Sequence, residues 1–359
     1  MHIPFCKHKC GYCDFNAYAG MDRLMPDYID ALERELASAR ERYAFKKLET
    51  IYLGGGTPSL LPAELMTRLV AFIRANFDVA EDAEVTLEAN PASTDATKVA
   101  AWLDSGVNRL SLGVQGFDGR ALAVLERRTD AAQATHAFEL ARSMGMRNIS
   151  IDLIYAVPHQ SLDSWLETLR RGLALGPDHI STYCLTFEEG TLLWRRRAQG
   201  KVPEVDPDLQ WDHLDAAIAE LEAAGYRRYE VSNWARPGYE SRHNHAYWRC
   251  RPVYGAGAGA HSYGTDGATA SRWWNVARPR DYIAALDPKA DGEELESRKR
   301  AAESLMLGLR TAEGMAPPAG FDPELAELVR SGLVARAGER VVPTRRGMDL
   351  HNQIALAVL

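Results

Sequence analysis

The sequence predicts an α/β protein in which a parallel sheet curls into an incomplete (β/α)6 barrel, followed by a small winged-helix-like α+β domain. Three observations lead to this class. Short apolar runs alternate six times with helical stretches in the first half of the chain. Polar motifs follow these runs, and the carboxyl ends of parallel strands are where reactive groups gather. The pattern then changes character near residue 226.

Six apolar runs are the expected strands of the barrel. The first, His2–Phe5, is too short for a full strand, which suggests that the natural chain starts further upstream. The others are Thr50–Leu53, Glu84–Glu88, Arg109–Leu112, Asn148–Asp152 and His179–Cys184. Helices are expected at 25–42, 62–77, 94–104, 118–127, 130–144, 162–175 and 208–224. Pro26 favours the start of the first helix, and Thr94 or Asp95 caps the third.

We expect three parts along the chain: a barrel at 1–225, a connecting segment at 226–286 and a C-terminal domain at 287–359. The connecting segment contains the motif His243-Asn-x-x-Tyr-Trp248 and the glycine-rich run Tyr254–His261. The last part has a helical pattern at 293–309 and a helix–hairpin tail at 322–343. Such a tail is typical of winged-helix domains, many of which bind DNA, although a fold alone does not establish a function.

Composition limits the class of protein. The 359 residues are 46% hydrophobic and 25% charged, as in globular proteins with a sizeable core. The 42 basic and 49 acidic side chains give a net charge of −7, so we expect no nucleic acid partner. No apolar run reaches the ~18 residues that span a bilayer, and no secretory signal is present. The five cysteines do not form a disulfide framework, and we therefore expect a cytoplasmic protein.

Three cysteines lie within eight residues, as Cys6, Cys10 and Cys13 in the spacing Cys-x3-Cys-x2-Cys. One compact loop can turn three thiolates toward a single iron–sulfur cluster. Three ligands for a four-iron cube leave one iron open for a reaction, as the open position does in catalytic zinc sites. The alternative is a structural zinc knuckle with His2 or His8 as fourth ligand, but zinc ligands usually come as two separated pairs.

Further candidate residues stand at the ends of the expected strands. The stretch Gly54-Gly-Gly-Thr-Pro58 either lets the backbone approach a ligand closely or forms a simple tight turn, and it lacks the spacing of a phosphate loop. Glu88 would face the barrel mouth, where a carboxylate accepts hydrogen bonds from hydroxyl or ammonium groups, or would lie solvated at the surface. Gln115, Arg127 and Asp152 share this placement, although Arg127 could also belong to an exposed helix.

Seven motifs extend over nearly the whole chain. They are Ile3-Pro-Phe-Cys6, Gly54-Gly-Gly-Thr-Pro-Ser59, Glu88-Ala-Asn-Pro91, Gly113-Val-Gln-Gly-Phe117, Asp152-Leu-Ile-Tyr155, Ser232-Asn-Trp-Ala-Arg-Pro237 and His243-Asn-x-x-Tyr-Trp248. Together they resemble the coproporphyrinogen dehydrogenase-like radical S-adenosylmethionine (radical SAM) proteins, most closely their heme-chaperone branch. In that superfamily the open iron binds SAM, and an electron from the reduced cluster breaks a sulfur–carbon bond.

The resemblance implies roles for individual residues. Cys6, Cys10 and Cys13 would hold a [4Fe–4S] cluster, while Gly55 and Glu88 would contact the SAM bound to it. A second SAM would bind at Tyr12, Gly56, Thr57, Gln115, Arg127, Asp152 and Thr186.

His243 is the candidate heme ligand, because imidazole is a usual axial partner of heme iron and Tyr247 and Trp248 offer flat apolar surface. On local sequence alone, a histidine among aromatic residues is more often a satisfied core residue. His261, after the glycine run, is the weaker candidate for a second ligand.

The chain departs from the dehydrogenases at two points. They continue the motif as Cys-x-Cys, whereas Asp14 and Phe15 follow Cys13 here, and their tyrosine before the first strand has no counterpart. The resemblance therefore implies a heme chaperone that hands heme to recipient hemoproteins and takes electrons for its cluster from a donor, with a peripheral membrane contact left open. The alternatives are an oxygen-independent coproporphyrinogen III oxidase and a zinc-stabilised winged-helix regulator.

Overall fold

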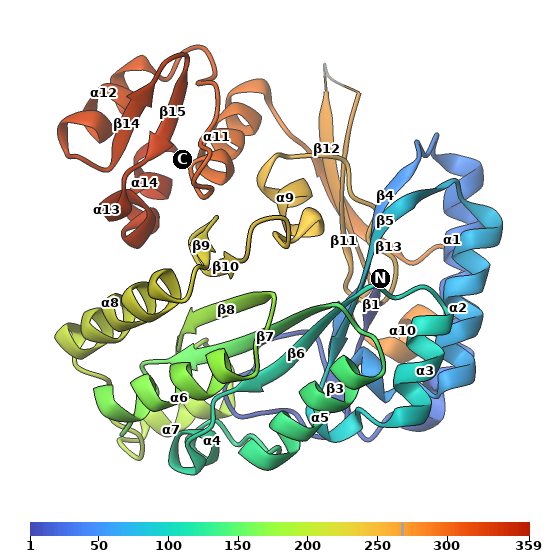
Figure 1. Ribbon diagram of the computed structural model, residues 1–359. Helices are drawn as coiled ribbons and strands as arrows, with labels where there is room; N and C mark the ends of the chain where they lie inside the picture. The colour runs from blue at the N-terminus through green and yellow to red at the C-terminus, as the bar shows by residue number, and fades with distance from the viewer. Residues whose placement is uncertain (267–268) are drawn as a thin grey trace.

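A computed structural model describes residues 1–266 and 269–359 of the chain. Its main sheet has eight strands in the order β1-β4-β5-β6-β7-β8-β10-β9 (Figure 1). Six run parallel: β1 (His2–Ile3), β4 (Leu48–Gly55), β5 (Val79–Ala89), β6 (Arg109–Gln115), β7 (Asn148–Tyr155) and β8 (His179–Cys184). Two short strands, β10 (Asn233–Ala235) and β9 (Arg227–Arg228), extend one edge in antiparallel pairing. The predicted incomplete (β/α)6 barrel is confirmed.

Helices pack on the outer face of this sheet (Figure 1). They are α1 (Met25–Arg42), α2 (Ala63–Asn76), α3 (Ala96–Asp104), α4 (Gly119–Val124), α5 (Ala131–Ser143), α6 (Leu162–Ala174), α7 (Leu192–Ala198) and α8 (Pro207–Ala223). Short 3-10 turns lie at Asp22–Leu24, Pro58–Leu60 and Pro91–Ser93, and β2 (Phe5–Cys6) pairs with β3 (Tyr18–Ala19). Of the two caps predicted for α3, Asp95 is the one that accepts from the Lys98 amide.

The strands alternate polar and apolar residues. On β6, Leu110 and Leu112 are fully buried in the core beneath the helices, so Arg109 and Ser111 between them point into the barrel. The same alternation runs through Thr50–Leu53, Glu84–Glu88, Asn148–Asp152 and the first half of His179–Cys184, where it ends at Ser181. Parallel strands buried on both faces usually read as continuous apolar runs. The polar inner face therefore indicates an interior suited to polar ligands.

The segment after the barrel forms elements that the sequence did not predict. They are α9 (Arg242–Trp248), α10 (Pro279–Ala284) and a separate antiparallel sheet of β11 (His261–Thr265), β12 (Ala270–Asn275) and β13 (Lys289–Glu294). The helix predicted at 293–309 begins later, as α11 (Ser297–Gly308). Its predicted start was wrong because Glu293 and Glu294 pair with β12.

A buried carboxylate ties the glycine-rich run to α1. Glu35 accepts four hydrogen bonds, from the Gly257 amide (2.9 Å), Asn275 (2.7 Å), Tyr254 (3.2 Å) and Tyr282 (2.5 Å). Burial raises the pKa of Glu35, and these donors oppose that rise by stabilising the anion. Gly257 has a φ of +108°, and a Cβ there would lie 2.4 Å from the His2 carbonyl oxygen. Glycine is therefore required where the run crosses β1.

The C-terminal elements have their own hydrophobic core. After α11 come α12 (Asp322–Arg330), the hairpin β14 (Val334–Ala337) and β15 (Arg340–Pro343), α13 (Arg345–Asp349) and α14 (His351–Val358). The predicted helix followed by a hairpin is confirmed. The division of the chain into three parts stays a prediction, and since β13 pairs with β12 we propose that the last boundary lies after Glu294 rather than before residue 287.

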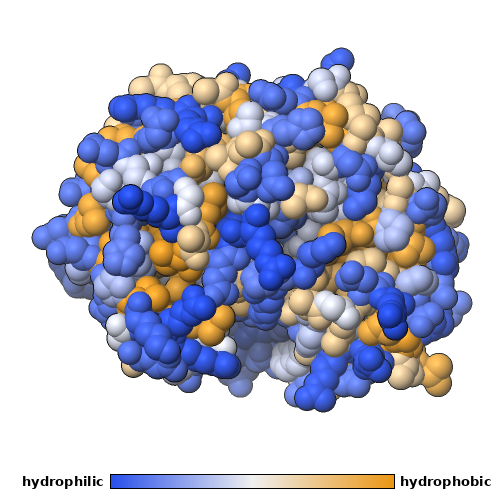
Figure 2. Space-filling view, turned by 90° about the horizontal axis from the view of Figure 1, so that it is seen from below, coloured by the Kyte–Doolittle hydropathy of each residue, from blue (hydrophilic) through white to orange (hydrophobic). Residues whose placement is uncertain are grey.

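None of the helices in the described ranges is both long enough and apolar enough to cross a membrane. Figure 2 shows one face of the molecule, where hydrophobic residues are dispersed among hydrophilic ones.

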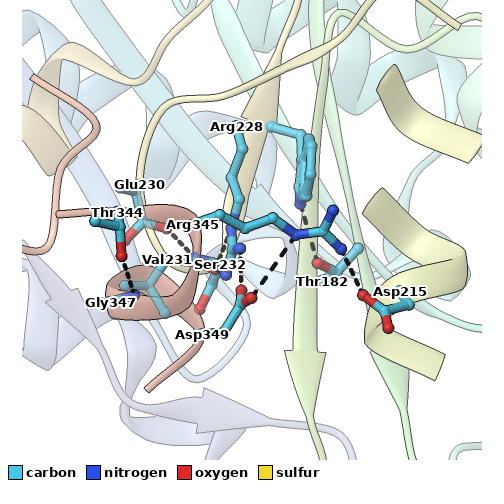
Figure 3. Close-up of polar contacts among 11 residues, drawn as sticks. Thr182, Asp215, Arg228, Glu230, Val231, Ser232, Thr344, Arg345, Gly347 and Asp349 are labelled. Atoms are coloured by element: carbon cyan, nitrogen blue, oxygen red, sulfur yellow. Dashed lines mark hydrogen bonds and ion pairs between the residues drawn. The ribbon is translucent and has the colours of Figure 1, made fainter. Parts of the chain in front are cut away.

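A mostly buried ion pair between Arg228 and Asp349 helps to join the C-terminal elements to the barrel (Figure 3). Arg228 on β9 donates to Asp349 at the end of α13, and also to the Val231 carbonyl oxygen at 2.7 and 3.1 Å. The side chains of Arg228 and Asp349 are only 9% and 12% exposed. A second pair between Arg345 and Asp215 on α8 is 62% and 66% exposed, so water screens it far more.

We expect Arg228→Ala to lower the free energy of unfolding by about 3 kcal/mol, because Asp349 would keep a largely buried charge without its main partner. The control Arg251→Ala removes the pair with Glu49, whose side chains are 51% and 62% exposed, and should cost only about 0–1 kcal/mol. Urea unfolding followed by circular dichroism measures both. Equal losses in the two variants would contradict this ranking of the ion pairs.

Candidate functional site

The cysteine loop leaves the barrel at the carboxyl end of β1. The Cys13 amide donates to the Cys10 carbonyl oxygen at 3.2 Å and closes a tight turn. Between them, the Gly11 carbonyl oxygen accepts from the Leu193 amide of α7 at 2.7 Å. The loop is therefore held in place from inside and from the neighbouring helix.

The three thiols are free but lie in different environments. Cys6 is buried with its Sγ 3.4 Å from the Thr57 hydroxyl, while Cys10 and Cys13 are half-buried. Burial raises the pKa of Cys6 and raises that of Cys13 to about 11. Within residues 1–266 and 269–359, no three His, Cys, Asp or Glu side chains are already arranged as metal ligands. Thiol sites commonly assemble only as the metal displaces their protons.

The glycine loop lies directly against the strand that leads to the cysteines. The Gly56 amide donates to the Ile3 carbonyl oxygen at 2.9 Å, and the Thr57 amide donates to that of Phe5 at 2.8 Å. A Cβ on Gly56 would lie 2.8 Å from the Phe5 carbonyl oxygen, and Gly55 has a φ of +116°. Only glycine allows this approach. The loop is thus more than a simple turn, because it positions the cysteine strand.

Glu88 lies near the carboxyl end of β5, as the sequence predicted, and its carboxylate contacts the glycine loop. Its Oε2 accepts from the Gly55 amide at 2.9 Å, and its Oε1 accepts from the Tyr52 hydroxyl at 2.6 Å. Burial raises the pKa of Glu88, and both hydrogen bonds oppose the rise. The carboxylate therefore links β4 to β5 beside the cysteine loop.

Gln115 and Arg127 come together around Gly113. Gln115 has a φ of +70°, uncommon outside glycine, at a register shift between β6 and β7. Arg127 donates to the Gly113 carbonyl oxygen, and its Nη1 lies 3.8 Å from the Cys10 Sγ. The chain turns inward after α4 because Glu126 has a φ of +55°. The alternative of an exposed helical Arg127 was therefore wrong.

The other predicted residues are less closely connected. Asp152 accepts a long hydrogen bond from the Ser111 hydroxyl at 3.4 Å, and burial raises its pKa. Tyr12 packs beside a small apolar cluster that contains Leu125. Thr186 is exposed beyond β8 and, among the described residues, makes no hydrogen bond to the other candidates.

Three features of the region formed by the cysteine loop, the glycine loop and Arg127 fit an iron–sulfur cluster with a charged nucleotide ligand. One loop supplies three free thiols, which is the donor set of an iron–sulfur cluster. The glycines leave no room for side chains. The Nε of Arg127 is buried without a hydrogen-bond partner in the part of the chain that the structure describes, which suits an anionic ligand.

His243 is on α9, which packs against β4 (Figure 1), and Tyr52 lies between its ring and Glu88. Its Nδ1 is 2.9 Å from the Thr50 hydroxyl, and its ring stacks on Tyr52 with centroids 4.7 Å apart. Its amide donates to Glu84 at 3.0 Å. Burial lowers the pKa of His243 to about 3, so the imidazole is neutral at pH 7. If Nδ1 carries the proton toward Thr50, Nε2 keeps a lone pair that could bind a metal.

Sequence reasoning missed Tyr52, which touches both Glu88 and His243, and Ser111, which contacts Asp152. The signal that could have found them is the regular alternation of polar and apolar residues along each strand. It places every second residue in the barrel interior beside the candidates.

Comparisons with known proteins agree with this geometry. A family model described as the Radical SAM superfamily matches residues 1–172. The heme chaperone HemW of Mycobacterium tuberculosis (strain ATCC 25618 / H37Rv) is 38% identical, covering 100% of this chain and 94% of the relative. HemW of Escherichia coli (strain K12) is 38% identical, with 99% and 96% covered. The solved structure of coproporphyrinogen III oxidase (HemN) from Escherichia coli shares the fold, with a TM-score of 0.85, 24% identity, and 99% and 88% covered.

The depressed pKa of His243 predicts a pH-dependent stability. The folded chain binds this proton only near pH 3, whereas the unfolded chain binds it near pH 6.5, so acidification below 6.5 favours unfolding. Between pH 7 and 5, wild type should therefore lose about 2 kcal/mol more than His243→Gln. Urea unfolding at both pH values measures this difference. The control His136→Gln changes an exposed residue and should behave as wild type, and parallel losses in all three proteins would contradict the assignment.

Proposed function

This chain belongs to the HemW family within the radical SAM superfamily, and from this we propose that it binds heme and delivers it to hemoproteins. The superfamily implies a [4Fe–4S] cluster and SAM. The observation that carries the proposal is the full-length similarity to HemW proteins together with the cysteine loop seated on the glycine loop. Recipient hemoproteins, an electron donor and a peripheral membrane contact remain parts of the proposal.

Cys6, Cys10 and Cys13 are the proposed cluster ligands. Their thiols are free, lie in one loop and are fixed by backbone contacts rather than by other metal-binding side chains. When bound, such a cluster supplies electron transfer to SAM. The protein contributes the position of the loop and the partial exclusion of water around Cys6.

The SAM ligands are proposed along the carboxyl ends of the strands. Gly55 and Glu88 already contact each other beside the cysteine loop, which supports a site for the first SAM. The proposed residues for a second SAM are Tyr12, Gly56, Thr57, Gln115, Arg127, Asp152 and Thr186. Of these, Arg127 has the clearest support, since its buried Nε has no partner in the described ranges.

His243 is the proposed axial ligand of heme. Its neutral ring, held by Thr50 and Tyr52, supports that role, and Tyr247 beside it is 43% exposed. Heme would then contact α9, which carries both His243 and Tyr247. The departure at Asp14 and Phe15 supports delivery of heme over oxidative decarboxylation of coproporphyrinogen.

We expect Cys10→Ala to abolish the iron–sulfur cluster, because two thiolates cannot replace three. Iron and acid-labile sulfide after anaerobic reconstitution, with EPR of the reduced sample, provide the measurement. The controls Cys184→Ala and Cys250→Ala change half-buried free thiols outside the loop and should keep wild-type iron content. One bound zinc without sulfide in the wild type would instead support a structural zinc site.

We expect His243→Ala to weaken heme binding at least about tenfold, seen as a reduced Soret band on titration, since one axial bond is lost. His136→Ala is the exposed control. In parallel, the wild type with SAM, reductant and coproporphyrinogen should form no protoporphyrinogen over many turnovers. Sustained turnover would overturn the chaperone proposal, and an unchanged titration would exclude His243 from the heme site.

A further inference from the structure

Arg109 is a buried cation without a partner. It opens β6 and is only 3% exposed. Its Nε is buried with no hydrogen bond, and among residues 1–266 and 269–359 no ion pair or side-chain hydrogen bond involves its guanidinium. Other buried ion-pair arginines of this protein, such as Arg228, are matched to a carboxylate. Arg109 is thus an exception inside the same fold.

The residues in register with Arg109 form a polar cluster on the inner face of the sheet. Arg109 is in register with Thr86 on β5 and Asn148 on β7, and side chains in register share a face of the sheet. Thr86 Oγ1 and Asn148 Oδ1 are likewise buried without partners in the described part of the chain. Three polar groups without partners therefore lie on neighbouring strands.

The charged and titratable groups that face Arg109 come from several elements. They are Tyr52 on β4, Asp152 on β7, His179 on β8, Tyr229 and, on α9, His243, whose pKa values all respond to its charge. Carboxylates also lie on this inner face, because Glu84 and Glu88 flank Thr86 on β5 and Asp152 is on β7. None of them forms an ion pair with Arg109 within the described ranges, so the guanidinium has no direct carboxylate partner.

An unpaired buried guanidinium is costly and cannot escape by losing its proton. Replacing a buried charge by an apolar residue of similar size is often stabilising when the charge serves no folding purpose. A guanidinium offers a fork of donors that matches a carboxylate. The missing partner of Arg109 is thus most simply the carboxylate of a ligand.

We propose that Arg109 binds a carboxylate of a small molecule held inside the barrel. The two sources of that chemistry, given the proposed function on which this inference rests, are a propionate of heme and the amino-acid end of SAM. Thr86 and Asn148 would lie beside the bound group. Ligand binding would then extend from the carboxyl ends of the strands to Arg109 at the start of β6.

The first test is the stability of the ligand-free protein. Arg109→Met should melt at or above the wild-type temperature, because an unpaired charge is removed, while the exposed control Arg120→Met should be unchanged. A lower melting temperature in Arg109→Met that Arg109→Lys restores would show a structural role and overturn the proposal.

The second test is equilibrium binding to reconstituted protein. Wild type should bind heme at least about tenfold more tightly than heme dimethyl ester if a propionate is the partner, and Arg109→Met should bind both alike. If SAM is the partner, Arg109→Met should bind SAM at least about tenfold more weakly and heme normally. Unchanged affinity for both ligands would overturn the proposal. Wild type that binds SAM but no heme would refute the proposed function. The SAM affinities of wild type and Arg109→Met would still decide whether Arg109 binds a carboxylate.

Discussion

The backbone contact between the glycine loop and the strand leading to the cysteines is the constraint on which the site depends. Gly56 and Thr57 donate to Ile3 and Phe5 and continue the pairing of β1 with β4 beyond the ends of both strands. Because Glu88 also accepts from Gly55, the next strand is fixed to the same loop. The strand leading to the cysteines, the glycine loop and the end of β5 are therefore connected by direct hydrogen bonds. Any bulkier residue in the triplet would separate them.

A second constraint is the division of each strand into an apolar and a polar side. The apolar side is covered by helices and supplies the core. Some polar side chains on the inner side have hydrogen-bond partners: the His179 ring lies 2.8 Å from the Ser150 hydroxyl and 2.9 Å from the Tyr229 hydroxyl. Others, such as Arg109 Nε and Thr86 Oγ1, have no partner in the described ranges. A buried polar group without a partner is costly, so these positions are better explained by ligands than by folding.

The sequence predicted the parts of this structure that local signals determine. The barrel helices follow amphipathic periodicity and caps such as Asp95, and each strand ends close to its predicted residue. The positions of Glu88 and the glycine loop followed from the rule that parallel strands present reactive groups at their carboxyl ends.

Contacts between distant segments could not be predicted in this way. The hydrogen bond between His243 and Thr50 joins residues 193 positions apart, and nothing local indicates it. The inward turn of Arg127 depends on a left-handed residue, Glu126, whose type gives no warning of that conformation. The sheet β11–β13 was missed because its third strand, Lys289–Glu294, is rich in charge and reads as exposed chain.

The placement of α9 has a consequence for how far cargo and redox chemistry are separated. Thr50, which contacts His243, and Gly55, which contacts Glu88, are five residues apart on one extended strand, a backbone span of roughly 16 Å. The Tyr52 side chain closes most of this gap, because its ring stacks on His243 and its hydroxyl donates to Glu88. A porphyrin bound at His243 would therefore be connected to the proposed SAM site through a single aromatic side chain.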